Sequence, residues 1–141
     1  MPQRDMVAGV IQLSNLLMRR LGPVFEKARV TPQQWAILST LSESEEPLTL
    51  AGVARVMSVS KQNMTGMIAR LEQLGLAERH DDPSDLRSSR LALTRRGRAT
   101  VDRLRPIYKQ WRDEMMTTLS ERDAAVMERC IEQLIQALQN E

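Results

Sequence analysis

Apolar residues in the first part of the chain recur at steps of three and four, which is the spacing of one face of an α-helix. They fall at Met6, Val10, Leu13, Leu17, Leu21 and Val24. We expect Gly22-Pro23 to disturb this helix near its end. A second helix is predicted from Pro32, because Thr31 can cap it and Gln34 can complete a capping box.

Two further helices are predicted close together. Thr49 can cap the first, and its inward positions are Leu50, Val53, Ala54 and Met57. Only Ser58 and Val59 separate it from Ser60, the cap of a helix that stops at Gly75. Two short helices joined by a tight turn form the outline of a helix-turn-helix motif.

After Gly75 the period changes to two. The segments L-A-E-R and R-L-A-L alternate apolar and polar residues, as half-buried strands do. Between them lies R-H-D-D-P-S-D-L-R-S-S-R, residues 79–90, which we expect to form the tip of a β-hairpin. Helices return from Thr94, with one apolar stripe from Val101 to Met115 and another from Met127 to Leu138.

Composition limits the class of protein. The chain has 141 residues, which fits one domain with its own core. It is 42% apolar but only 3% aromatic, so the core must come from aliphatic residues and methionine, which favours helices. A single cysteine excludes an internal disulfide framework. With neither a membrane-spanning apolar run nor a signal-peptide pattern at its start, the chain is expected to be cytoplasmic.

Charge is distributed unevenly although the net charge is only +2. Seven arginines crowd one region in which Asp102 is the only carboxylate: Arg87, Arg90, Arg95, Arg96, Arg98, Arg103 and Arg105. A locally basic zone on a nearly neutral protein suggests a surface that faces a polyanion. Taken alone, the same cluster fits a solvated charged face equally well.

The helix that starts after Ser60 has an unusual outward face. A helical wheel gathers Met64, Met67, Ile68, Leu71 and Leu74 on one side. The opposite side carries small and polar residues: Lys61, Gln62, Asn63, Thr65, Gly66, Ala69, Arg70 and Gln73. Gly66 costs about 1 kcal/mol against alanine in the middle of a helix, so it is expected to serve close approach to another surface.

The major groove of duplex DNA is such a surface. Glutamine and asparagine can bond adenine edges, lysine and arginine can bond guanine, and threonine can contact the thymine methyl group. The first turn, at Ser60, also points backbone N–H groups at phosphates. The alternative is an amphipathic helix whose outer face is simply solvated.

These features together resemble the MarR family of bacterial transcription regulators. The segments that carry the resemblance are residues 48–60 (L-T-L-A-G-V-A-R-V-M-S-V-S), 74–79 (L-G-L-A-E-R), 82–87 (D-P-S-D-L-R) and 91–97 (L-A-L-T-R-R-G). The resemblance implies a mainly α fold with a small β-hairpin wing. It places a winged helix-turn-helix lobe at 31–97 and dimerisation helices at 1–30 and 98–141.

The resemblance also implies a function and its residues. A homodimer would bind double-stranded DNA at a pseudo-palindromic operator, more as a repressor than as an activator, and a lipophilic or phenolic effector would release it. Arg87 at the wing tip would enter the minor groove, and Asp85 would hold the wing. Contacts to phosphates are expected from Arg79, Ser88, Ser89 and Arg90. Leu86 stands where many relatives place a second arginine.

Other functions have less support in the sequence. We find no nucleophile–base pair, metal-ligand cluster or glycine-rich phosphate loop, so no catalytic residue, metal or cofactor is expected. His80 is the only histidine and is interpreted as a wing residue, while Cys130 is interpreted as a small hydrophobic residue and not as a redox sensor. An effector-independent DNA-binding protein and a protein-interaction winged helix remain the alternatives.

Overall fold

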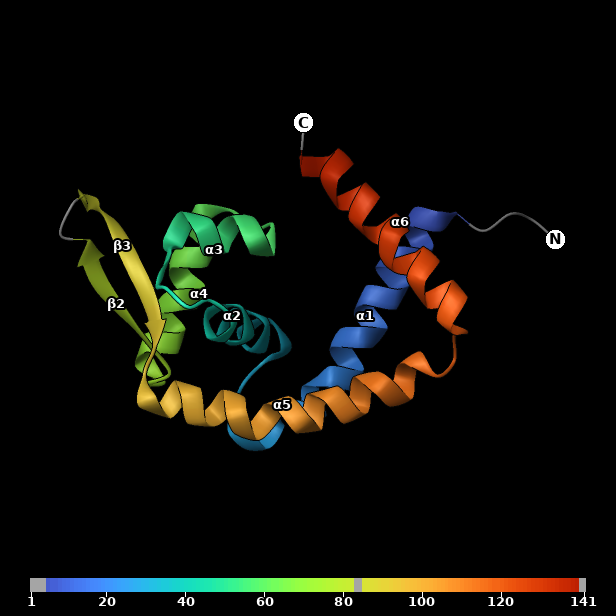
Figure 1. Cartoon of the computed structure of the whole chain (residues 1–141), viewed down its shortest axis with the longest axis horizontal. Coiled ribbons are helices and arrows are strands. Elements are labelled where there is room, and N and C mark those ends of the chain that lie inside the picture. The colour runs from blue at the N-terminus through green and yellow to red at the C-terminus, as the bar shows by residue number, and fades with distance from the viewer. Residues whose placement is uncertain (1–4, 83–84, 140–141) are drawn as a thin grey trace. The chain divides into compact units, whose positions relative to one another are not determined.

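A computed structural model describes residues 5–82 and 85–139, with the backbone alone for Asp82 and for 85–88. The elements in chain order are α1 (Met6–Phe25), η1 (Glu26–Ala28), α2 (Pro32–Glu43), β1 (Leu48–Thr49), α3 (Leu50–Met57), α4 (Lys61–Gln73), β2 (Ala77–Asp82), β3 (Asp85–Leu93), α5 (Arg95–Met116) and α6 (Glu121–Gln139) (Figure 1). The chain divides within α5 into two compact units, Met1–Leu104 and Arg105–Glu141. The mainly α fold with a small β-sheet is confirmed.

The first two helices form where the apolar pattern predicts them. Pro23 lies in the last turn of α1, which ends two residues later at Phe25. The Phe25 ring is buried and stacks on Trp35 of α2, with ring centroids 5.4 Å apart. The capping box of α2 is present, because Thr31 Oγ1 accepts from the N–H of Gln34 and Gln34 Oε1 accepts from the N–H of Thr31.

The helix-turn-helix consists of α3 and α4. Thr49 Oγ1 accepts from the N–H of Gly52 at the start of α3, and Ser60 Oγ accepts from the N–H of Asn63 at the start of α4. Ser58, in the turn between them, adopts the left-handed conformation with φ 55°. Both caps supply acceptors for N–H groups that have no partner inside the helix, so the two helices start where the sequence predicts.

The wing is a three-stranded antiparallel sheet in the order β1-β3-β2. The apolar pattern did not predict β1, whose Leu48 and Thr49 pair with Leu91 and Arg90 of β3. The prediction that the whole of 79–90 forms a hairpin tip is wrong, because β2 continues to Asp82 and β3 begins at Asp85. The strand ladder bonds backbone to backbone, so polar side chains can extend it into solvent without an apolar face.

The core of the first unit draws on the helices α1 to α5 and on the sheet. Its fully buried members come from segments far apart in the sequence: Phe25, Ile37, Leu38, Val53, Met64, Ile68, Leu71, Leu91 and Val101. Aliphatic residues, methionine and one phenylalanine fill it, as the composition predicts. Trp35 is also buried in this core.

The start of α5 packs tightly against the turn that follows α4. Thr94 Oγ1 donates to the Gly75 carbonyl at 2.6 Å and accepts from the N–H of Gly97 at 2.9 Å. The N–H of Thr94 donates to the Leu76 carbonyl at 3.1 Å. A Cβ atom at Gly97 would overlap that same carbonyl oxygen, so only glycine permits this approach of α5 to the chain.

The two ends of the chain carry apolar residues that the chain itself leaves exposed. On α1 they include Met6, Val7, Val10 and Ile11, each more than half exposed. In the second unit, α6 has no buried residue, and its large apolar side chains are all exposed: Val126, Met127, Ile131, Leu134, Ile135 and Leu138. Cys130 is exposed on the same helix. None of the helices in the described residues has the length and apolar character that a membrane crossing requires.

Replacing Gly97 by alanine should destabilise the first unit. The added methyl group collides with backbone at Leu76, and overpacking of this kind costs about 1–3 kcal/mol or more. Chemical denaturation of the Gly97→Ala variant measures the loss in the free energy of unfolding. Gly66→Ala is the matched control, because a Cβ there meets nothing within 4 Å and alanine should stabilise the helix by roughly 1 kcal/mol. Equal stability of the two variants would contradict the close contact.

Candidate nucleic-acid interface

One face of α4 packs into the core and the other is open. Met64, Ile68 and Leu71 are fully buried, while Met67 and Leu74 are partly buried, so the five inward positions are those that the helical wheel predicts. All eight outward positions are exposed: Lys61, Gln62, Asn63, Thr65, Gly66, Ala69, Arg70 and Gln73. The helix is therefore anchored on one side and leaves a complete polar surface on the other.

The hydrogen bonds on this face leave several groups available to a partner. The Thr65 hydroxyl donates to the Lys61 carbonyl at 2.9 Å, and Arg70 Nη1 lies 3.4 Å from Gln73 Oε1. The side-chain amides of Gln62 and Asn63 make no hydrogen bond to any residue that the structure describes. Amides that lack an internal partner can bond base edges without first breaking a contact.

Gly66 lies at the centre of the open face. A Cβ atom at this position would meet no neighbouring atom within 4 Å, so the fold itself does not require glycine here. Because glycine weakens a helix interior, its presence without a packing reason favours close approach by something outside the chain.

The wing is joined to α4 by an ion pair. Arg79 Nη2 of β2 lies 3.0 Å from Glu72 Oε1 of α4, and both side chains are about one-third exposed at 32% and 35%. Arg79 is predicted to contact phosphate, and no pattern in the sequence indicates this carboxylate partner. On the same strand, His80 Nε2 lies 3.1 Å from Glu78 Oε1, with both side chains at least half exposed. In Figure 1 the two long strands project from the region where α4 ends.

The other wing residues are only partly described. Ser89 and Arg90 are half-buried on β3, and Arg90 lies opposite His80 on one side and Thr49 on the other. The backbone of Asp85, Leu86, Arg87 and Ser88 belongs to β3, but their side chains lie outside the described residues. Pro83 and Ser84, between the strands, lie outside them as well.

The arrangement of exposed side chains on α4 suits binding to a partner surface. Over the residues that the structure describes, no three His, Cys, Asp or Glu side chains gather where they could hold a metal ion. The surface consists of the 13-residue helix α4, with its polar and small side chains, beside the projecting hairpin of β2 and β3. The major groove of B-form DNA is wide enough to admit an α-helix.

Comparison with known proteins identifies the protein family. A sequence model of the MarR family matches residues 30–88, which hold α2, β1, α3, α4, β2 and the start of β3. The HTH-type transcriptional regulator FarR of Neisseria gonorrhoeae is 34% identical over 89 residues, or 63% of this chain and 60% of FarR. The chain belongs to the MarR family. Proteins of this family are DNA-binding transcription regulators and not enzymes.

Solved structures share the MarR fold over nearly the whole chain. The S. aureus MepR–DNA complex superposes with a TM-score of 0.89 at 19% identity, and covers 96% of this chain and 99% of MepR. NadR in complex with 4-hydroxyphenylacetate gives a TM-score of 0.78 at 24% identity, over 96% of this chain and 95% of NadR. At these identities the likeness shows the fold. The chain spans about 60% of the length of FarR.

Proposed function

We propose that this MarR-family chain binds a pseudo-palindromic operator as a homodimer and represses transcription from the cytoplasm until a small effector releases it. In this proposal α4 enters the major groove, and the wing formed by β2 and β3 enters the minor groove. The bases are contacted from Gln62, Asn63, Thr65 and the open surface at Gly66, with Lys61 and Arg70 beside them. The first turn of α4, after Ser60, directs N–H groups at phosphate.

The observation that carries the proposal is the outward face of α4. Its eight residues are exposed, its central residue is a glycine that the fold does not need, and the amides of Gln62 and Asn63 have no internal partner among the described residues. Glycine at the centre of a solvated helix only destabilises that helix. In a helix that lies against base edges, glycine lets the backbone approach the groove, because a side chain at this position would hold the backbone away.

The wing supplies contacts of a second kind. Ser89 and Arg90 lie on β3, where they can reach the phosphates that flank the groove, and Ser88 and Arg79 are assigned the same task. Arg87 is proposed to occupy the minor groove with Asp85 orienting it, since a guanidinium suits the negative potential of a narrow minor groove.

Dimerisation accounts for the apolar surface at both ends of the chain. The exposed aliphatic and methionine side chains of α1 and α6 are too many and too large to be left in water on a stable monomer. A second copy would bury them, and two-fold symmetry would then set the two reading helices about one helical turn of DNA apart. The palindromic operator follows from that symmetry.

Release of the protein from DNA by an effector requires that the effector bind one conformation of the protein more tightly than another. A ligand shifts the protein away from DNA only if it binds the non-binding conformation more tightly than the binding one. NadR, which shares the fold, has been solved with 4-hydroxyphenylacetate, a phenolic acid, and this supports a phenolic effector for the present chain.

Selection of bound sequences from a random pool of duplex DNA tests the proposal. We expect enriched sites that are inverted repeats, with half-site centres one helical turn apart, because a dimer carries two copies of α4. Affinity for the enriched site should fall as the salt concentration rises. A pool without enrichment, or enriched sites without symmetry, would contradict the proposed DNA-bound dimer.

Gly66→Leu separates DNA contact from stability. Leucine fits the free chain, where a Cβ at this position meets nothing within 4 Å, and it should stabilise α4 by somewhat less than 1 kcal/mol. Against DNA the side chain should hold the helix away from the bases, and the affinity for the selected operator should fall by roughly tenfold or more. Fluorescence anisotropy measures the affinity and denaturation the stability. Gly66→Ala should show a smaller loss, and unchanged DNA affinity in the leucine variant would remove this face from the interface.

Glu72→Gln tests the assignment of Arg79 to phosphate. The substitution releases the guanidinium from its carboxylate partner at 3.0 Å, so Arg79 can contact DNA without competition. We expect tighter operator binding and a steeper dependence on salt, with a change in stability below about 1 kcal/mol because the pair is partly exposed. Glu78→Gln, which removes a carboxylate from the same lobe but leaves Arg79 paired, is the control. Weaker binding in Glu72→Gln would show that the pair itself shapes the DNA-bound wing.

A further inference from the structure

Thr65 is exposed on the outward face of α4, directly before Gly66. Its hydroxyl is already in use, because Thr65 Oγ1 donates to the Lys61 carbonyl, four residues earlier in the same helix, at 2.9 Å. The Cβ atom of threonine carries one hydroxyl and one methyl group. Since the hydroxyl is turned back to the helix backbone, the methyl group is the part of the side chain that an approaching surface meets. Thr65 therefore presents an apolar group although threonine is a polar residue.

The stability of α4 gives no reason for a threonine at this position. Threonine is one of the weaker helix formers, and a hydrogen bond to the carbonyl four residues back does not compensate for this. The residue is exposed, so the core does not require it either. Together with Gly66, two consecutive residues of the outward face lower the helix propensity of α4, which favours a role in contact with a partner.

Gln62 and Asn63 differ from Thr65 in what they offer to a base. Their side-chain amides make no hydrogen bond to any residue in the described part of the chain, so they are ready to bond base edges. The Thr65 hydroxyl would first have to leave the Lys61 carbonyl, and the side chain would have to change its rotamer. Hydrogen-bonded recognition is therefore expected from the two amides, and apolar recognition from Thr65.

Thymine is the base that exposes an apolar group in the major groove, because its C5 atom carries a methyl group that cytosine lacks. We propose that Thr65 is a specificity-determining residue, whose methyl group contacts the C5 methyl of a thymine and so selects a T·A pair at one position of each half-site. The inference rests on the proposed function, because it requires α4 to lie in the major groove. Gly66 allows the close approach that removes both methyl groups from water.

Uracil substitution tests the contact, because uracil pairs with adenine as thymine does and lacks only the methyl group. Each thymine on either strand of one half-site of the selected operator is replaced singly, and the affinity is measured by fluorescence anisotropy. We expect one position at which uracil weakens binding of the wild-type chain roughly fourfold, the effect of one methyl group left in water. Half-sites without a thymine, or unchanged affinity at every substituted position, would overturn the proposal.

Two substitutions at position 65 separate the methyl group from the hydroxyl. Thr65→Ser removes the methyl group in both subunits, so it should weaken binding of the thymine operator roughly tenfold, and uracil should then cost almost nothing further. Thr65→Val keeps a methyl group and removes the hydroxyl, so it should remain as sensitive to uracil as the wild type. Sensitivity that persists in Thr65→Ser, or that disappears in Thr65→Val, would contradict recognition through the methyl group.

Cytosine methylation gives an independent test at the same position. With a C·G pair in place of the sensitive T·A pair, the wild-type chain should bind 5-methylcytosine more tightly than cytosine, again by roughly fourfold. Thr65→Ser should bind the two operators equally. Equal binding of the two operators by the wild-type chain would count against a methyl contact at this position.

Thr117→Ser is the matched control. Thr117 is also an exposed threonine, and its hydroxyl donates to the Glu114 carbonyl at 2.6 Å, but it follows α5 and does not belong to α4. This variant should keep the operator affinity and the uracil sensitivity of the wild type, and an equal loss in it would overturn the assignment to Thr65. Binding to a duplex without the operator should be the same in all variants, because phosphate contacts do not depend on base methyl groups.

The proposed function and the role of Thr65 fail in different ways. If no sequence is enriched from the random pool, the proposed function is wrong and the role of Thr65 is wrong with it. If a symmetric operator is enriched but is insensitive to uracil, the proposed function stands and Thr65 does not recognise thymine.

Discussion

The contact between Gly97 and the Leu76 carbonyl determines how the first unit is assembled. It brings the backbone of α5 against the turn that follows α4, closer than any side chain at position 97 would allow. Thr94 secures the approach with hydrogen bonds to Gly75, Leu76 and Gly97. The end of α4, the base of the wing and the start of α5 are therefore joined through backbone groups and the Thr94 hydroxyl. Their geometry does not depend on surface charges, which salt would screen.

Local signals predicted much of the fold. The caps at Thr31, Thr49 and Ser60 and the periodicity of apolar residues gave the starts of α2, α3 and α4, because capping and amphipathicity depend only on neighbours within about one turn. The same reasoning separated the buried face of α4 from its open face at every position named. Sequence alone therefore predicted which residues of α4 are exposed and which are buried.

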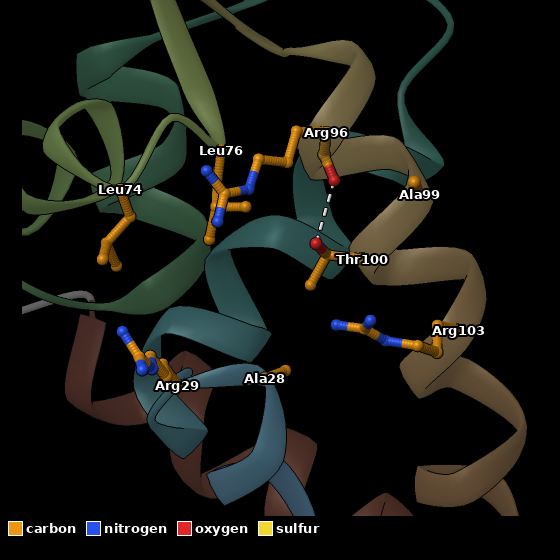
Figure 2. Close-up of a pocket in the computed structure, with 8 residues that line it drawn as sticks. All are labelled: Ala28, Arg29, Leu74, Leu76, Arg96, Ala99, Thr100 and Arg103. Atoms are coloured by element: carbon orange, nitrogen blue, oxygen red, sulfur yellow. Dashed lines mark hydrogen bonds between the residues drawn. The ribbon is translucent and has the colours of Figure 1, made fainter.

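Long-range contacts could not be predicted in this way. Two residues are too few to show a period, so β1 was missed, and the polar ends of β2 and β3 lack the alternation that marks a half-buried strand. The pair between Arg79 and Glu72 crosses a turn, and the pocket that Arg29, Leu74 and Arg96 help to line joins three segments that only the fold brings together (Figure 2). The apolar stripes on α1 and α6 predicted helices, but no pattern in the sequence names the surface that covers them.

Thr49 has two structural tasks, and their combination couples the wing to the helix-turn-helix. Its backbone pairs with Arg90 as the end of β1, while its hydroxyl caps α3 three residues before Gly52. There is no connecting loop between the strand and the helix, since β1 ends at Thr49 and α3 begins at Leu50. Because no flexible segment separates the strand from the helix, a displacement of β3 is transmitted through Thr49 to the first turn of α3. The wing and the helix-turn-helix therefore move together as one piece.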